Sequence, residues 1–132
     1  MSLLSLFVYD SFMGKFKKGD VLWGTERKFQ EAWHPIVYIS GPSEAPVAVV
    51  LTSEGGVSCN VPLHNIYRDN DPSHFIDHLI QKMAEWGPYE KFATLKQEDL
   101  ELIERHMANK QSITWFEYQE YSRNGCPEHP KH

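Results

Sequence analysis

The feature that most constrains the fold of this chain is a series of short apolar runs between Gly19 and Tyr67. Each run is rich in Val, Ile, Leu or Trp, and Gly, Pro or polar residues break it after a few positions. This pattern is typical of strands joined by tight turns, and it predicts strands at 20–24, 35–40, 47–52 and 57–62. Residues 36–39 are all apolar, so the second strand is expected to be buried on both faces or central. Because the runs follow one another so closely, we expect a small, strongly bent sheet.

After Tyr67 the apolar residues take helical spacing. Asp71 and Pro72 are typical residues for the start of a helix, and the apolar positions that follow recur on one helical face. The pairs Thr94 with Gln97 and Thr114 with Glu117 resemble capping boxes. The predicted helices cover 72–86, 95–109 and 115–123. The chain is therefore expected to be one α+β domain, 1–132, with a small β-barrel at about 16–67 and 90–94 followed by C-terminal helices.

The composition and charge of the chain limit the classes of function that it can have. The chain has 132 residues and a net charge of −5, whereas proteins that hold nucleic acid through phosphate contacts usually show a basic face. One local basic stretch interrupts the acidic balance, and an ordinary solvated surface is the simpler interpretation of it: Lys15, Lys17, Lys18, Arg27 and Lys28. The two cysteines, Cys59 and Cys126, form no CxxC pair, which favours a reducing, cytoplasmic setting. No apolar run approaches the roughly 20 residues of a membrane-spanning helix, so no membrane partner is expected.

The histidines invite a metal interpretation. His74 and His78 stand four residues apart on the predicted helix 72–86, a spacing that can place two imidazoles on one metal. The Glu of the HExxH pattern is missing, and only guesswork would supply His64 or Asp71 as a third ligand. A solvent-facing pair is the better interpretation. We therefore predict no metal site, and the lack of nucleotide-binding or hydrolase motifs predicts no cofactor.

His34 lies at the entrance of the strand that begins with Pro35, where Pro favours extended backbone in the residue before it. Thr52 and Ser53 end the apolar strand 47–52. If these two strands pair, an imidazole and a hydroxyl meet at one rim of the sheet. An imidazole can transfer protons near neutral pH, as RNA cleavage through the 2′-hydroxyl requires, and a hydroxyl can orient a phosphate. A structural His and a turn-forming Thr-Ser pair explain the same residues equally well.

The order GDVLW, charged connector, HPIVYIS and VAVVLTSEGG resembles the PemK/MazF-like toxin family of small SH3-like barrels. The segment TLKQEDLELIERHM is similar to the closing helix of that family. The resemblance spans roughly residues 19–108. In the family pattern an Arg precedes the Pro that matches Pro35, whereas this chain has His34 at that position.

The resemblance implies a metal-independent endoribonuclease that is commonly a homodimer and is neutralised by an antitoxin-like protein. Thr52 or Ser53 falls near the catalytic hydroxyl of the family. His34 replaces a permanently charged, bidentate phosphate clamp by a titratable ring, so its expected role is general acid or base. Arg27 and Lys28 in the connector, together with His64, are the expected substrate-binding residues for RNA.

Two other classes of function stay open. In a non-catalytic SH3-like protein-interaction module, Trp23, Trp33 and Tyr38 would line a groove for a partner, and the acidic helical half would face it. A metal-dependent enzyme is the third interpretation.

Overall fold

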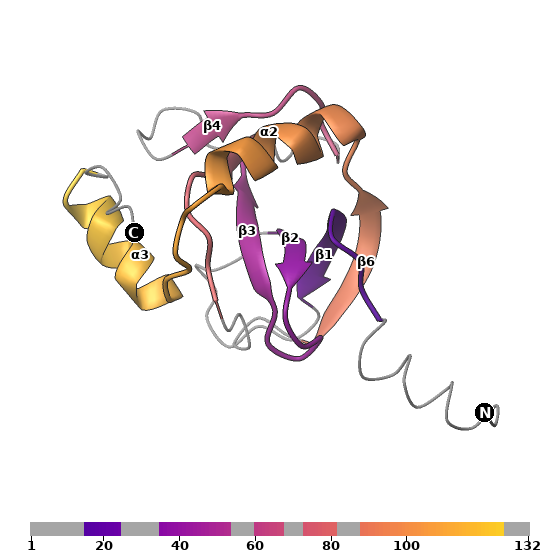
Figure 1. Ribbon diagram of the computed structural model, residues 1–132, viewed down its shortest axis with the longest axis horizontal. Coiled ribbons are helices and arrows are strands. Elements are labelled where there is room, and N and C mark those ends of the chain that lie inside the picture. The colour runs from indigo at the N-terminus through magenta and orange to yellow at the C-terminus, as the bar shows by residue number, and fades with distance from the viewer. Residues whose placement is uncertain (1–14, 25–34, 54–59, 68–72, 82–87, 126–132) are drawn as a thin grey trace, which may run out of the picture.

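The computed structural model describes residues 15–24, 35–53, 60–67, 73–81 and 88–125 (Figure 1). Within these ranges the protein has an α+β fold with six strands and two helices, which confirms the predicted class. The strands are β1 (Asp20–Gly24), β2 (Ile36–Ser40), β3 (Val47–Thr52), β4 (Asn60–Pro62), β5 (His74–Ile76) and β6 (Tyr89–Thr94). The helices are α2 (Gln97–Met107) and α3 (Trp115–Arg123).

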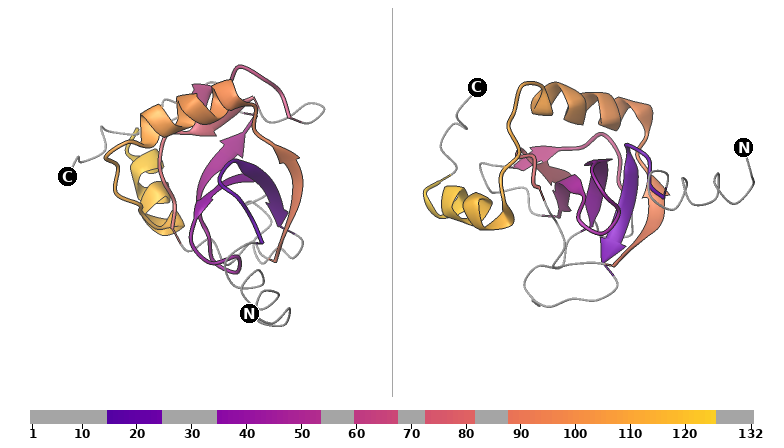
Figure 2. Two further views of the ribbon diagram at one scale, coloured as in Figure 1. Left: turned by 45° about the vertical axis from the view of Figure 1, so that its right-hand side comes forward. Right: turned by 60° about the horizontal axis from the view of Figure 1, so that its bottom comes forward.

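The strands form one antiparallel sheet in the order β4-β5-β3-β2-β1-β6. In the part of the chain that is described, β4 and β6 stand at the two ends of this order and do not pair with each other. A closed barrel is therefore not confirmed. The sheet is nevertheless strongly curved, and α2 runs across the same end as the segment that follows β4 (Figures 1 and 2).

Both faces of the central strands β1, β2 and β3 are buried, as the unbroken apolar run in β2 predicts. On the first face, which we call the α2 face, the strand residues Val21, Val37 and Val49 pack in one cluster with Ile103 and Met107 of α2. On the second face, the α3 face, the alternate strand residues pack with Tyr118 of α3: Leu22, Ile36, Val50 and Ile76. The side-chain period of two along each strand produces this division. The core thus lies on both sides of β1, β2 and β3.

The two helices differ in how well the sequence locates them. Thr114 caps α3 and forms the predicted capping box with Glu117, so this helix is confirmed at Trp115–Arg123. The N-cap of α2 is Lys96, and the predicted cap Thr94 is instead the last residue of β6, paired with Asp20. Neither of these helices is long and apolar enough to cross a membrane.

The helix predicted at 72–86 is wrong for the described residues 73–81. His74–Ile76 is strand β5, and Ile80 then exchanges backbone hydrogen bonds with Ala48 of β3 at 2.7 and 2.8 Å. The apolar pairs Phe75-Ile76 and Leu79-Ile80 satisfy a helical stripe, but they equally suit an extended chain buried on both sides. Phe75 packs on the α2 face while Ile76 and Ile80 pack on the α3 face. Tertiary burial therefore overrides the helical pattern.

Because Phe75 is fully buried, replacing it tests this strand assignment. We expect Phe75→Ala to lower the free energy of unfolding by about 3–5 kcal/mol, since it leaves a cavity under α2. Phe116 is 67% exposed on α3, so Phe116→Ala serves as the matched control and should change stability by no more than about 0.5 kcal/mol. Urea unfolding measures both values, and equal losses in the two variants would contradict the described packing.

Candidate functional site

A hydroxyl and an imidazole face each other where β3 ends. Thr52 is the last residue of β3 and pairs with His74, the first residue of β5. Residues directly opposite in an antiparallel pair project from the same face, with Cβ atoms about 5 Å apart. His74 is half-buried, and its Nδ1 lies 2.8 Å from the hydroxyl oxygen of Ser73. Thr52 is only 4% exposed, whereas the following Ser53 is exposed. Of the two predicted hydroxyl residues, Thr52 therefore lies opposite His74, and Ser53 is the next residue along the chain.

His34, the predicted partner of Thr52, lies outside the described residues, as do Arg27 and Lys28. The strand that follows His34 does pair with β3, as predicted: the carbonyl oxygen of Pro35 accepts a hydrogen bond from the N–H of Leu51 at 2.9 Å. The predicted meeting of His34 with Thr52 therefore stays a prediction, and His74 is a residue that the sequence interpretation missed.

His64, another predicted substrate-binding residue, belongs to the segment that follows β4. Pro62 of β4 pairs with His74, and the N–H of Leu63 donates to the carbonyl oxygen of Ser73 at 2.9 Å. The His64 side chain is exposed, and its backbone N–H donates to Oδ1 of Asp99 at 2.7 Å. His64 is thus two residues along the chain from the strand that flanks His74.

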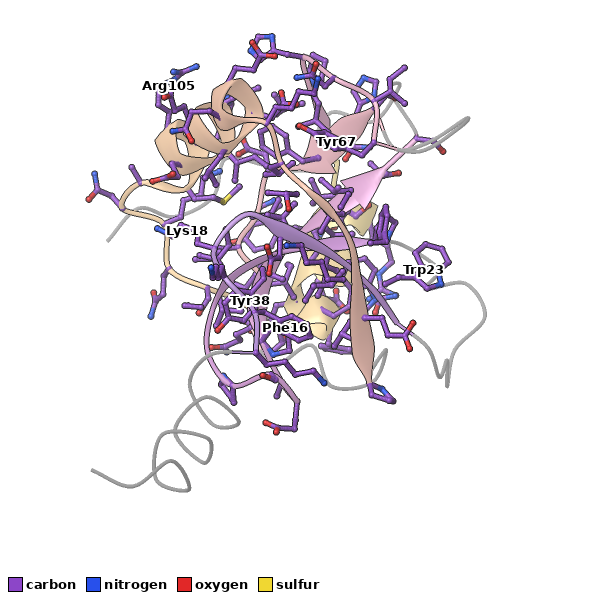
Figure 3. All side chains as sticks on the ribbon, turned by 90° about the vertical axis from the view of Figure 1, so that its right-hand side faces the viewer. Phe16, Lys18, Trp23, Tyr38, Tyr67 and Arg105 are labelled. Atoms are coloured by element: carbon purple, nitrogen blue, oxygen red, sulfur yellow. The ribbon has the colours of Figure 1, made fainter. Side chains whose placement is uncertain are left out.

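The carboxylate of Asp99 joins the segment after β4 to the start of α2. Asp99 has no exposed surface, and besides the His64 N–H it accepts hydrogen bonds from Asn65 Nδ2 at 3.0 Å and from the Tyr67 hydroxyl. The Tyr67 oxygen in turn accepts the N–H of Lys96 at 3.0 Å. We call these groups the Asp99 network; Tyr67 lies beside α2 in Figure 3. A buried carboxylate is tolerated only with such donors.

Burial, and then the hydrogen bond to Asp99, raise the pKa of the Tyr67 hydroxyl well above its ordinary value. Because the folded protein holds the proton more tightly than the unfolded chain, the stabilisation by Tyr67 is complete below about pH 10 and is lost as the pH rises further. The Asp99 network is therefore a source of alkaline sensitivity.

The predicted solvent-facing pair of His74 and His78 is not found. His78 is 4% exposed, and its ring packs against the rings of Tyr118 and Tyr121 of α3, with centroids 5.6 and 5.3 Å away. Strand β5 and the bend that follows it replace the helix that would have aligned the two imidazoles. Within residues 15–24, 35–53, 60–67, 73–81 and 88–125, no three His, Cys, Asp or Glu side chains gather to hold a metal ion.

The predicted aromatic groove is not assembled by its described members. Tyr38 packs with the residues of the α3 face and lies 5.9 Å from the ring of Phe16. Trp23 follows Leu22 of the α3 face by one position, so it projects to the α2 face, where its ring contacts Phe92. Figure 3 shows Trp23 apart from Phe16 and Tyr38. Trp33 lies outside the described residues.

The described part of the basic stretch carries mixed charge. The Nζ atom of Lys18 lies 3.9 Å from a carboxylate oxygen of Glu104 on α2, and both side chains are about half exposed. Asp20 is buried and accepts the N–H of Lys17 at 2.9 Å, while its other oxygen lies 3.2 Å from Lys91 Nζ. The Lys18–Glu104 pair is screened by solvent and contributes little to stability, which suits the interpretation of this stretch as solvated surface.

The candidate site therefore consists of Thr52, Ser53, Ser73 and His74, with His64 nearby along the chain. Comparison of the chain with protein-family models, curated proteins and solved structures finds no match.

Tyr67→Phe tests the Asp99 network. The variant removes a donor to a buried carboxylate and the acceptor of the Lys96 N–H, so we expect unfolding to become easier by about 1–3 kcal/mol near neutral pH. It should also flatten the fall in stability between about pH 10 and higher pH, because the tightly held proton is gone. Urea unfolding across this range measures both effects. Tyr121→Phe, outside the network, is the control; if it reproduces both changes, the network has no special role.

Proposed function

We propose that the protein is a metal-independent endoribonuclease of the toxin–antitoxin type, acting at the end of β3. The observation that carries this proposal is the pairing of Thr52 with His74, whose Nδ1 lies 2.8 Å from the Ser73 hydroxyl. The Ser73 contact restrains the ring and leaves Nε2 as the nitrogen for proton transfer. An oriented imidazole beside hydroxyl groups supplies what RNA needs for cleavage by its own 2′-hydroxyl.

The reaction needs two proton transfers and no metal. A base removes the proton from the 2′-hydroxyl, and the oxygen forms a bond to the adjacent phosphorus. The bond from phosphorus to the 5′-oxygen then breaks, and that oxygen takes a proton from an acid. The products are a 2′,3′-cyclic phosphate and a 5′-hydroxyl. His74 serves as one proton-transfer group, and the sequence prediction supplies His34 as the other.

The three hydroxyl residues have separate roles in this proposal. Ser53 is exposed and donates to a non-bridging phosphate oxygen. Thr52 is buried opposite His74, so it acts as a positioning residue. Ser73 holds Nδ1 of the ring. Arg27, Lys28 and His64 bind the flanking phosphates in this proposal, because an acidic chain needs local cations to hold RNA.

We propose that the fold is an SH3-like barrel whose two end strands are linked by side chains instead of a strand ladder. β4 and β6 are the end strands of the sheet, and the Asp99 network connects the segment after β4 with the segment after β6. We further propose that the protein acts as a homodimer and binds an antitoxin-like protein, as the resemblance implies, and that it acts in the cytoplasm, as its cysteine usage favours.

The test is cleavage of a mixed single-stranded RNA at low salt in the presence of EDTA, with the product ends sequenced. We expect cleavage that leaves a cyclic phosphate and falls by about 100-fold or more in His74→Ala. His34→Ala should show a loss of the same order, and Ser53→Ala a smaller one. Phe116→Ala is the matched control and should cleave normally, because Phe116 is 67% exposed on α3 and is not part of the candidate site.

Cleavage that survives in His74→Ala, or that disappears with EDTA, would contradict the proposal. If the protein neither cleaves RNA nor binds it at low salt, where electrostatic binding is strongest, the non-catalytic interaction module is favoured instead.

A further inference from the structure

Three side chains gather on the α2 face at the β1–β6 edge of the sheet: Trp23, Glu90 and Phe92. We propose that they form a binding site for an arginine side chain of a basic peptide segment in a partner protein. The site lies on the opposite face from Thr52 and His74, so it is independent of the proposed RNA cleavage.

A β-bulge adds Phe92 to the pair formed by Trp23 and Glu90. Lys91 pairs with Leu22 and Ala93 with Val21, so Phe92 is the extra residue between two paired positions. Bulges of this kind re-aim a side chain. The Phe92 ring meets the Trp23 ring edge-on, with centroids 6.4 Å apart and planes at 87°. Phe92 is 36% exposed, a large apolar surface for a strand residue.

A carboxylate completes the site. Glu90 pairs directly with Trp23 across β1 and β6, so both side chains project from the same face, and Glu90 is exposed. The nearest cation along the strand, Lys91, points to the other face, where its Nζ lies 3.2 Å from Asp20. Lys91 therefore does not neutralise Glu90.

This combination matches a guanidinium group. The faces of aromatic rings attract cations, Trp most strongly, and a planar guanidinium also stacks on them while it donates to a carboxylate. Stacked nucleic-acid bases are the competing occupant of this partly exposed aromatic pair. Glu90 disfavours that occupant because it repels the phosphate that accompanies each base. The net charge of −5 likewise attracts a basic partner.

The test follows the indole N–H resonance of Trp23 by NMR during titration with acetyl-Gly-Arg-Gly-amide. The chain has four tryptophans, and Trp23→Phe identifies the signal. We expect a saturable shift in the millimolar range. The citrulline peptide, which is neutral and of the same shape, should bind at least about threefold more weakly. Glu90→Gln and Phe92→Ala should each weaken binding by a similar factor.

Glu44→Gln is the control for charge, since Glu44 is an exposed carboxylate in the turn between β2 and β3. It should leave the titration unchanged. Glu44, Glu90 and Phe92 are exposed, so unchanged circular dichroism spectra and melting curves should accompany the binding results for these three variants. Equal binding of the arginine and citrulline peptides, or no shift of the Trp23 signal, would overturn the proposal. So would a uridine dinucleotide that shifts this signal at lower concentration than the arginine peptide, because the surface would then be a base-stacking site.

Discussion

The arrangement of this protein depends on the hydrogen bonds that the buried carboxylate of Asp99 accepts. Within the described residues the sheet is open between β4 and β6, and an end strand of only three residues, as β4 is, is weak by itself. Asp99 accepts from His64 and Tyr67, and Tyr67 accepts from Lys96 just before α2. The two ends of the sheet are thereby held through side chains. A buried carboxylate without hydrogen-bond donors would lower the stability of the fold. Asp99 can therefore be buried only if its donors bind it at the same time.

The candidate site inherits its geometry from this arrangement. β4 has only three residues and pairs with β5, whose first residue is His74. Asp99 fixes the chain immediately after β4, and this restrains β4 and, through it, β5 against β3. At the other end of β5, Asp77 contacts Lys110 and His106 of the α2 region. His74 therefore sits on a strand that is anchored beyond both of its ends, as a proton-transfer group needs for a constant position.

The sequence predicts the elements whose signals are local. The strands β1, β2 and β3 follow from apolar runs between turn residues, and α3 follows from the Thr114–Glu117 capping box. The segment 73–81 cannot be predicted in this way, because paired apolar residues at Phe75 and Leu79 fit a helix and a doubly buried strand alike. Only the place of this segment beside β3 decides between them. The Asp99 network cannot be predicted in this way either, since its partners are 29 to 35 positions apart in the chain.

The same distinction explains the errors at the candidate sites. The pairing of His74 with Thr52 depends on hydrogen bonds between two strands that are far apart in the chain, so no spacing in the sequence predicts it. The prediction of an aromatic groove, by contrast, neglected the alternation of side chains between the two faces of a strand. In the β1–β2 register Leu22 pairs with Ile36, so Trp23 and Tyr38 fall on opposite faces, although both are aromatic and both belong to adjacent strands. Aromatic residues in neighbouring strands therefore share a surface only when the register places them on the same face. Trp23 and Glu90 are placed on one face by the β1–β6 register, and the bulge adds the aromatic ring of Phe92 to that face.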